Sequence, residues 1–155
     1  MSHAQKWTPI CPKLRRVQER AEANKSEVFT SLAHHLNLDA LRRAYHGLRA
    51  KAAAGPDGED KASYGKALER RLNDLYERLK ADRYRATPAK RIYLDKPDGS
   101  QRPIQLQTIE DKIVQSALVE ILNSIYEADF APFSYGFRPG RSQHMALQAL
   151  QTALQ

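Results

Sequence analysis

The strongest helical pattern in the sequence lies between residues 108 and 126, and it constrains the fold more than any other feature. Thr108 is a favoured helix N-cap, and Asp111 stands at the third helical position, from which a carboxylate reaches back in a capping box. The apolar residues that follow recur at the three- and four-residue spacing of one helix face: Ile113, Val114, Ala117, Leu118, Ile121, Leu122 and Ile125. We therefore expect a helix over 109–126 at the centre of the core.

Other segments predict further helices around this one. Apolar residues mark one helix face from residue 38 to 48, and a leucine stripe marks another from 68 to 79. The turn sequence Gly55-Pro56-Asp57-Gly58 separates the two. A short helix is expected over about 12–24, and Ser142 is expected to cap a last helix that runs on to the final residue.

Between residues 90 and 106 the pattern becomes that of a β-hairpin. Arg91-Ile92-Tyr93-Leu94 has strand character, Pro97-Asp98-Gly99-Ser100 is a turn, and residues 102–106 return as a second strand. Pro103 cannot donate a backbone hydrogen bond, which suits an edge position or a strand start. The order of elements predicts an α+β fold, mainly helical, with a small antiparallel β-hairpin.

Composition and charge narrow the choice of partners. The 155 residues carry a net charge of +7 and have a pI of about 9.6, which favours a polyanion, nucleic acid above all, over an inert basic surface. The single cysteine, Cys11, excludes an intrachain disulfide and a cysteine-based zinc site, and it suits a reducing cytoplasm. No apolar run approaches the roughly 20 residues that cross a bilayer. We expect a cytoplasmic protein with no membrane partner.

The hairpin carries the first group of candidate binding residues. Lys96 and Arg102 flank its turn, so their side chains can converge across the two strands on one polyphosphate. Lys90 and Arg91 add positive charge at the base of the hairpin. The alternative for the turn residues is ion pairing with the neighbouring carboxylates of Asp95 or Asp98.

A loop at residues 134–142 carries the second group. Its sequence is Ser-Tyr-Gly-Phe-Arg-Pro-Gly-Arg-Ser. Glycine lets a backbone approach a ligand closely, arginine binds phosphate in a fork, and aromatic rings either stack on bases or anchor the loop in a core. The candidate nucleic-acid-binding residues here are Tyr135, Gly136, Phe137, Arg138, Pro139, Gly140, Arg141 and Ser142.

Catalytic and metal-binding chemistry is not evident. The adjacent acidic pairs are Glu59-Asp60, in a turn, and Glu110-Asp111, at a helix start, and both have structural explanations. We therefore assign no catalytic residue, no metal ligand and no cofactor to this sequence.

Three separated motifs together resemble bacterial group II intron-encoded reverse transcriptases, also called intron maturases. They are Lys-Pro-Asp-Gly-Ser-Gln-Arg-Pro-Ile over 96–104, Thr-Ile-Glu-Asp-Lys-Ile-Val-Gln over 108–115 and the loop over 134–142. The turn at 55–58 resembles the family's Gly-x-Asp-Gly turn, and Leu72, Leu75 and Leu79 followed by Tyr84 and Pro88 resemble its run-in to the first strand. The resemblance covers residues 38–155, in the family's order and spacing.

The resemblance implies the fingers and the start of the palm of a right-hand polymerase. The family's triphosphate-binding lysine and arginine correspond to Lys96 and Arg102, and its template-side segment corresponds to 135–142. It divides the chain into a basic arm with a short helix over 1–37, a fingers-like region over 38–133, and a template-side loop with the start of the palm over 134–155. One departure is Ile104-Gln105-Leu106-Gln107, where the family has Leu-Gly-Ile-Pro.

The family's catalytic aspartates follow the last segment of resemblance, beyond residue 155. We therefore expect that the Mg²⁺ of the complete enzyme is not bound here and that this chain is inactive alone. The expected partners are RNA (the intron or a template), a DNA primer and a palm-thumb polypeptide. Two alternatives remain: a stand-alone, non-catalytic RNA-binding module, and a fragment that self-associates or binds a protein partner through the exposed apolar face of the 109–126 helix.

Overall fold

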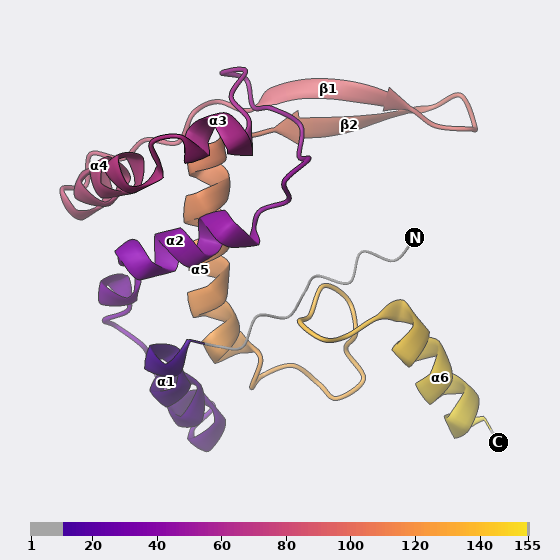
Figure 1. Cartoon of the computed structure of the whole chain (residues 1–155). Coiled ribbons are helices and arrows are strands. Elements are labelled where there is room, and N and C mark those ends of the chain that lie inside the picture. The colour runs from indigo at the N-terminus through magenta and orange to yellow at the C-terminus, as the bar shows by residue number, and fades with distance from the viewer. Residues whose placement is uncertain (1–10, 155) are drawn as a thin grey trace. The chain divides into compact units, whose positions relative to one another are not determined.

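The computed structural model describes residues 11–154 (Figure 1). The first ten residues of the expected basic arm and Gln155 lie outside the described residues. In chain order the elements are α1 (Pro12–Ala23), the 3-10 turn η1 (Ala33–His35), α2 (Leu38–Gly47), α3 (Lys61–Gly65), α4 (Leu68–Lys80), β1 (Lys90–Asp95), β2 (Gln101–Leu106), α5 (Ile109–Tyr126) and α6 (Gln143–Ala153). The predicted α+β class is confirmed, because the described elements are helices and one two-stranded antiparallel hairpin.

Internal contacts divide the chain into two compact units. One unit is Ser31–Val119, and the other joins the residues up to Thr30 to those from Glu120 onward. The helix α5 runs through the point of division. The three-part functional division expected from the sequence stays a prediction.

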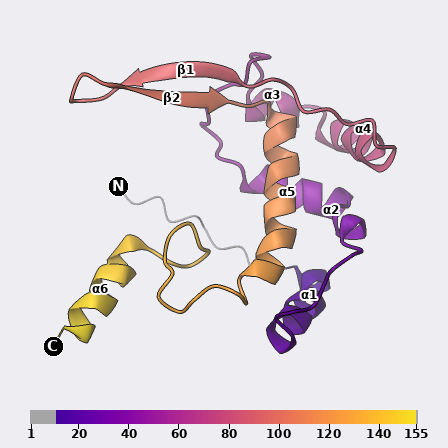
Figure 2. The ribbon, with the colours of Figure 1, turned by 180° about the vertical axis from the view of Figure 1, so that it is seen from behind.

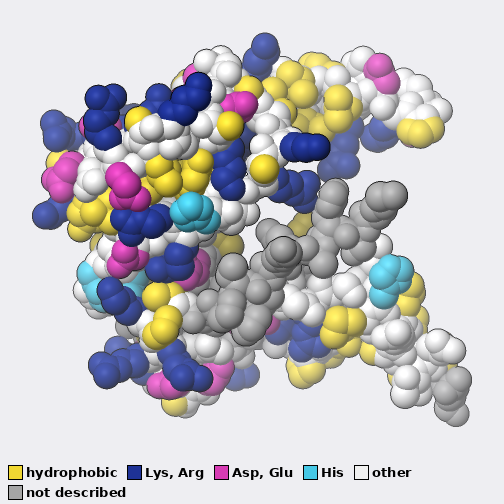
Figure 3. Space-filling model, viewed as in Figure 1, with side chains coloured by type: hydrophobic (Ala, Val, Ile, Leu, Met, Phe, Trp, Pro, Cys, Tyr) yellow, Lys and Arg dark blue, Asp and Glu magenta, His cyan; other side chains and the backbone are white. Residues whose placement is uncertain are grey.

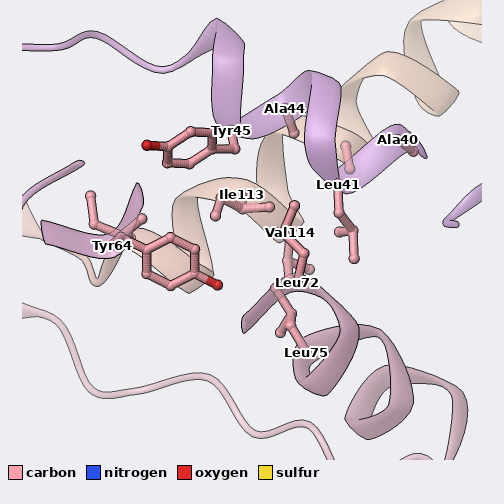
Figure 4. Close-up of a cluster of buried hydrophobic side chains, with 11 residues drawn as sticks. Ala40, Leu41, Ala44, Tyr45, Tyr64, Leu72, Leu75, Ile113 and Val114 are labelled. Atoms are coloured by element: carbon pink, nitrogen blue, oxygen red, sulfur yellow. The ribbon is translucent and has the colours of Figure 1, made fainter. Parts of the chain in front are cut away.

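The core of the unit Ser31–Val119 lies between α2, α3, α4 and the first half of α5 (Figure 4). Leu41 from α2, Leu72 and Leu75 from α4, and Ile113 from α5 are all completely buried. Figure 4 shows Ile113 and Val114 lying between the side chains of α2 and those of α4. The helix predicted over 109–126 therefore supplies the centre of this core, as its apolar face indicates.

The start of α5 is fixed by its predicted cap. The backbone N–H of Asp111 donates to Thr108 Oγ1 at 3.2 Å, which confirms Thr108 as the N-cap. The Asp111 carboxylate does return to Thr108, but it accepts from the threonine hydroxyl, with 2.7 Å between Thr108 Oγ1 and Asp111 Oδ2. Asp111 is only 4% exposed, so this cap is part of the buried structure.

The same carboxylate secures both ends of the hairpin. Tyr84, in the connection that leads to β1, donates its hydroxyl to Asp111 Oδ1, while Thr108 follows β2. Burial, followed by this hydrogen bond, raises the pKa of Tyr84 well above its ordinary value, so the hydroxyl remains a donor at neutral pH. Asp111 thus ties the chain before β1 to the chain after β2.

Gly55 packs the early turn against the exit from β2. A Cβ at this position would lie 2.7 Å from the Gln107 carbonyl oxygen and 2.9 Å from Thr108 Cα, closer than a side chain tolerates. Glycine is therefore required for the backbone of the 55–58 turn to approach the end of β2.

The hairpin pairs β1 with β2 in a single antiparallel register. Tyr93 lies opposite Pro103 and Leu94 opposite Arg102. Gly99, at φ 78°, occupies the left-handed position of the turn, which favours glycine. Figures 1 and 2 show the hairpin projecting as an arm from the helices of its unit.

The other unit contains α1, the last turns of α5, a long loop and α6. The helix α1 buries Leu14, Val17 and Ala21, and the last turns of α5 bury Ile121 and Ser124. Ser142 caps α6 as predicted, accepting from the Met145 N–H at 3.3 Å. The helix α6 buries none of its residues, and most of its predicted apolar positions are exposed to solvent.

Candidate nucleic-acid interface

The hairpin register places Lys96 and Arg102 on the same face. Side chains alternate along a strand, so Leu94 and its partner Arg102 share a face. The Lys96 N–H donates to the Ser100 carbonyl at 2.8 Å, which continues the ladder one pair beyond β1. Lys96 is therefore a diagonal neighbour of Arg102, at a distance that two long side chains can bridge.

The carboxylates beside the turn have other partners. Asp95 Oδ1 accepts from Gln101 Nε2 at 3.0 Å, and Asp98 Oδ1 accepts from the Ser100 N–H at 2.9 Å and its hydroxyl at 2.7 Å. Among residues 11–154, neither Lys96 nor Arg102 forms an ion pair, and both are exposed. The two cations are thus free to bind an external anion.

Lys90 and Arg91 are exposed at the base of β1 but lie on opposite faces of the hairpin. Lys90 pairs with Leu106 and shares the face of Lys96 and Arg102. Arg91 pairs with Gln105 on the other face. A single flat ligand on one face therefore contacts only one of these two predicted residues.

Arg138 is the most enclosed residue of the second candidate group. Only 8% of its surface is exposed, and its Nε and Nη2 donate to Glu127 Oε1 at 2.9 and 2.6 Å. Its Nη1 donates to the carbonyls of Ala131 and Ser134, at 3.0 and 2.9 Å. The guanidinium also lies 4.8 Å from the centre of the Phe130 ring. These bonds close the loop between α5 and α6 on itself.

Other residues of the loop face solvent. Phe137 is completely exposed and has a φ of 58°, a left-handed conformation that costs a bulky residue energy. Gly140, at φ 68°, supplies the next left-handed position, and Gly136 has open space where a Cβ would stand. The loop therefore exposes an aromatic ring to solvent from a backbone conformation that is unfavourable for that residue.

The remaining candidates lie at the edges of the loop. The Arg141 guanidinium lies 5.4 Å from the centre of the Tyr135 ring, and both residues are half-buried. Pro139 is half-buried as well, and Ser142 is engaged as the cap of α6. Arg141 has no ion pair within residues 11–154, in contrast to Arg138.

Comparison with known proteins gives a consistent set of relatives. The group II intron-encoded protein LtrA of Lactococcus lactis subsp. cremoris is 33% identical over 145 residues, which are 92% of this chain and 24% of LtrA. Protein YkfC of Escherichia coli K12 is 37% identical over 100 residues, 64% of this chain and 26% of YkfC. A 91 kDa protein in the cob intron of Schizosaccharomyces pombe is 34% identical over 117 residues, 76% of this chain and 14% of that protein. No family model matches the sequence.

This chain is homologous to group II intron-encoded proteins.

The relatives LtrA and YkfC are both much longer than the chain. It spans about a quarter of the length of LtrA and of YkfC, at 24% and 26%. The family recognised from three motifs is therefore shown by sequence identity over most of the chain, while the roles of individual residues are not assigned by these matches.

One residue of this homologue of group II intron-encoded proteins has a structural role that the sequence did not reveal. Glu127 holds Arg138, yet it follows the last residue of α5 and stands eleven positions before its partner. No helical or strand spacing links two residues across an irregular loop, so the sequence gives no signal for this ion pair.

The described residues contain neither a metal-binding cluster nor a membrane-spanning helix. Within residues 11–154, no three His, Cys, Asp or Glu side chains gather in a way that could hold a metal ion. None of the described helices has the length and apolarity that crossing a membrane requires. Figure 3 shows Lys and Arg side chains spread over the visible face, interspersed with Asp and Glu.

Proposed function

We propose that this chain forms the fingers and the start of the palm of an RNA-directed DNA polymerase of the group II intron type. In this proposal it binds the RNA template and the phosphates of the incoming nucleotide. The observation that carries the proposal is the hairpin register, which puts Lys96 and Arg102 on one face without an ion-pair partner among the described residues.

The hairpin would bind the triphosphate through two complementary cations. Arg102 offers a planar fork that matches two phosphate oxygens, and Lys96 offers a point charge on a flexible stem. The turn joins the two strands and keeps the two cations close together. The neighbouring carboxylates do not pair with either cation, because Asp98 accepts from Ser100 and Asp95 accepts from Gln101. Lys90, on the same face, extends the positive charge toward the base of the arm.

The loop over 134–142 would contact the template. Phe137 presents an aromatic ring on which a base can stack, and Arg141 supplies a charge for the backbone phosphate. Tyr135, Gly136, Pro139 and Gly140 shape the chain around them, and Ser142 starts α6. Arg138 serves this site as a positioning residue, because its bonds to Glu127, Ala131 and Ser134 hold the loop closed.

Magnesium is expected for the complete enzyme, but the described residues do not fit a site for it, since no suitable group of ligands gathers among them. In this proposal these residues bind phosphate and base, and none of them is assigned as a metal ligand. The relatives include an intron-encoded protein and a nuclear intron maturase, which supports intron RNA as the partner. A DNA primer is the further partner that the proposed reaction requires.

The proposal is tested by measuring binding of single-stranded RNA and of a deoxynucleoside triphosphate to the whole chain. We expect RNA affinity to fall as salt rises, because phosphate contacts release counterions. Arg141→Ala is expected to weaken RNA binding, and Lys96→Ala with Arg102→Ala to weaken nucleotide binding. Unchanged affinities in both variants would remove the site assignment.

A protein-binding role is the second candidate, and one observation favours it. The helix α6 buries no residue, yet Met145, Leu147 and Leu150 are exposed on it at 39%, 62% and 56%. Light scattering across a concentration series distinguishes this role, since self-association through α6 raises the mass and Leu147→Glu with Leu150→Glu abolishes the increase.

A further inference from the structure

The hairpin has a second face, which the proposed nucleotide site does not use. Because side chains alternate, Arg91, Tyr93 and Asp95 of β1 share this face with Gln101, Pro103 and Gln105 of β2. The hydrogen bond between Gln101 and Asp95 confirms that these two side chains lie together. All six residues are exposed, whereas the first face is half-buried at Ile92, Ile104 and Leu106.

An apolar pair stands at the centre of this exposed face. Tyr93 lies opposite Pro103, and the tyrosine is 56% exposed. Its hydroxyl makes no hydrogen bond within residues 11–154, so neither burial nor a polar partner accounts for an aromatic residue here. A flat ring beside a proline is a surface on which another ring can stack.

The neighbours of the pair favour nucleic acid as the occupant. Arg91 lies two residues from Tyr93 on the same face, where its guanidinium can reach a phosphate, and Gln105 lies opposite Arg91. Asp95 is the acidic residue of the face, and its carboxylate is engaged by Gln101. An aromatic ring beside a cation is the chemistry that binds an unpaired base and its phosphate.

We propose that Tyr93 and Pro103 form a stacking platform for one unpaired nucleobase of a single-stranded RNA, with Arg91 on the adjacent phosphate. This proposal rests on the proposed function and adds a second binding face to the hairpin. The face of Lys96 and Arg102 binds nucleotide phosphates, and the face of Tyr93 binds a base of the RNA strand.

The test compares variants of the whole chain in binding an unstructured 12-nucleotide RNA and a duplex RNA of the same length. Tyr93→Ala is expected to weaken binding of the single strand about tenfold, a usual effect of removing one stacking ring. Tyr93→Phe retains the ring and is expected to bind as the unchanged chain does. Tyr126→Ala is the matched control, because Tyr126 is 55% exposed and lies on α5.

A second measurement reports stacking directly. Placing 2-aminopurine in the single strand, we expect its fluorescence to be quenched by the unchanged chain and by Tyr93→Phe, and not by Tyr93→Leu, which keeps an apolar strand residue. Circular dichroism shows whether each variant is folded.

The outcomes separate the two proposals. If the unchanged chain binds no RNA, both fail. If it binds RNA and Tyr93→Ala binds equally well, or loses affinity equally for single strand and duplex, the platform is overturned while the proposed function stands.

Discussion

At the scale of single residues, the two arginines of the loop over 134–142 have different roles despite equal charge and close spacing. Arg138 is 8% exposed and bonded to Glu127 and two carbonyls, whereas Arg141 is half-buried and has no ion pair among the described residues. A motif with two arginines therefore combines one residue that holds the loop together with one that we propose contacts RNA.

This difference predicts that the two alanine substitutions affect different properties, stability for Arg138 and RNA affinity for Arg141. Arg138→Ala leaves the Glu127 carboxylate without its cation and is expected to lower the free energy of unfolding by about 3 kcal/mol, the lower part of the range for breaking an enclosed ion pair. Urea unfolding measures this loss. Arg141→Ala is expected to leave the unfolding midpoint unchanged and to reduce RNA affinity; a reversed result would mean that the roles are exchanged.

The sequence reveals such residues unequally. The cap of α5 at Thr108 is predicted because a helix start depends on residues three positions apart. The burial of Arg138 is not predicted, because its partner Glu127 lies eleven residues away across an irregular segment. Lys96 and Arg102 lie between these cases: their shared face follows from the strand pattern only once the register is known.

At the scale of elements, the hairpin depends on one buried carboxylate. Asp111 accepts from Tyr84 before β1 and from Thr108 after β2. Asp111→Ala leaves two hydroxyl donors without their acceptor and is expected to cost about 3 kcal/mol, at roughly 1–3 kcal/mol for each donor that stays buried. Hydrogen exchange should show faster exchange in β1 and β2. The control is Glu77→Ala on the exposed face of α4, which should change neither.

The hairpin turn has a pH dependence of its own. Hydrogen bonds from the Ser100 hydroxyl, and then from its N–H, lower the pKa of Asp98 from its ordinary value of 3.8. A depressed pKa means that the carboxylate stabilises the turn fully above the unfolded-state value, and that this stabilisation is lost as pH falls through the folded-state pKa. The turn should therefore be intact at neutral pH and loosen only in acid, below 3.8.

NMR titration of the Asp98 carboxyl group measures this pKa. In Ser100→Ala it should rise toward 3.8, because the largest of its causes is removed. Ser63→Ala, which removes a different serine at the start of α3, should leave it unchanged. A titration of Asp98 at its ordinary value in the unchanged chain would contradict the turn geometry.

Elements with a strong period are predicted well, and short ones are not. The positions of α2, α4, α5 and the hairpin follow from helical or alternating patterns, and their ends differ from expectation by a residue or so. The helix α3 spans Lys61–Gly65, too short to show a period, and its stability depends on the Asp60 cap, which accepts from the Ser63 N–H at 2.8 Å. The sequence pattern therefore predicts no helix over 61–65.

At the scale of the whole molecule, the two proposed binding surfaces lie in different units. The hairpin belongs to Ser31–Val119, and the loop over 134–142 belongs to the unit that continues from Glu120. The proposed function assigns the nucleotide phosphates to the hairpin and the RNA template to the loop. The sequence indicated the two candidate surfaces separately through the family resemblance, and the match to LtrA covers 92% of the chain.

The most direct test of this account is primer extension on an RNA template by the chain mixed with a palm-thumb polypeptide that carries the family's catalytic aspartates. Co-sedimentation first establishes that the two associate. We predict magnesium-dependent DNA synthesis by the mixture, none by the chain alone, and loss of synthesis with Lys96→Ala and Arg102→Ala. Synthesis by the chain alone, or an associated mixture that synthesises no DNA, would contradict the account.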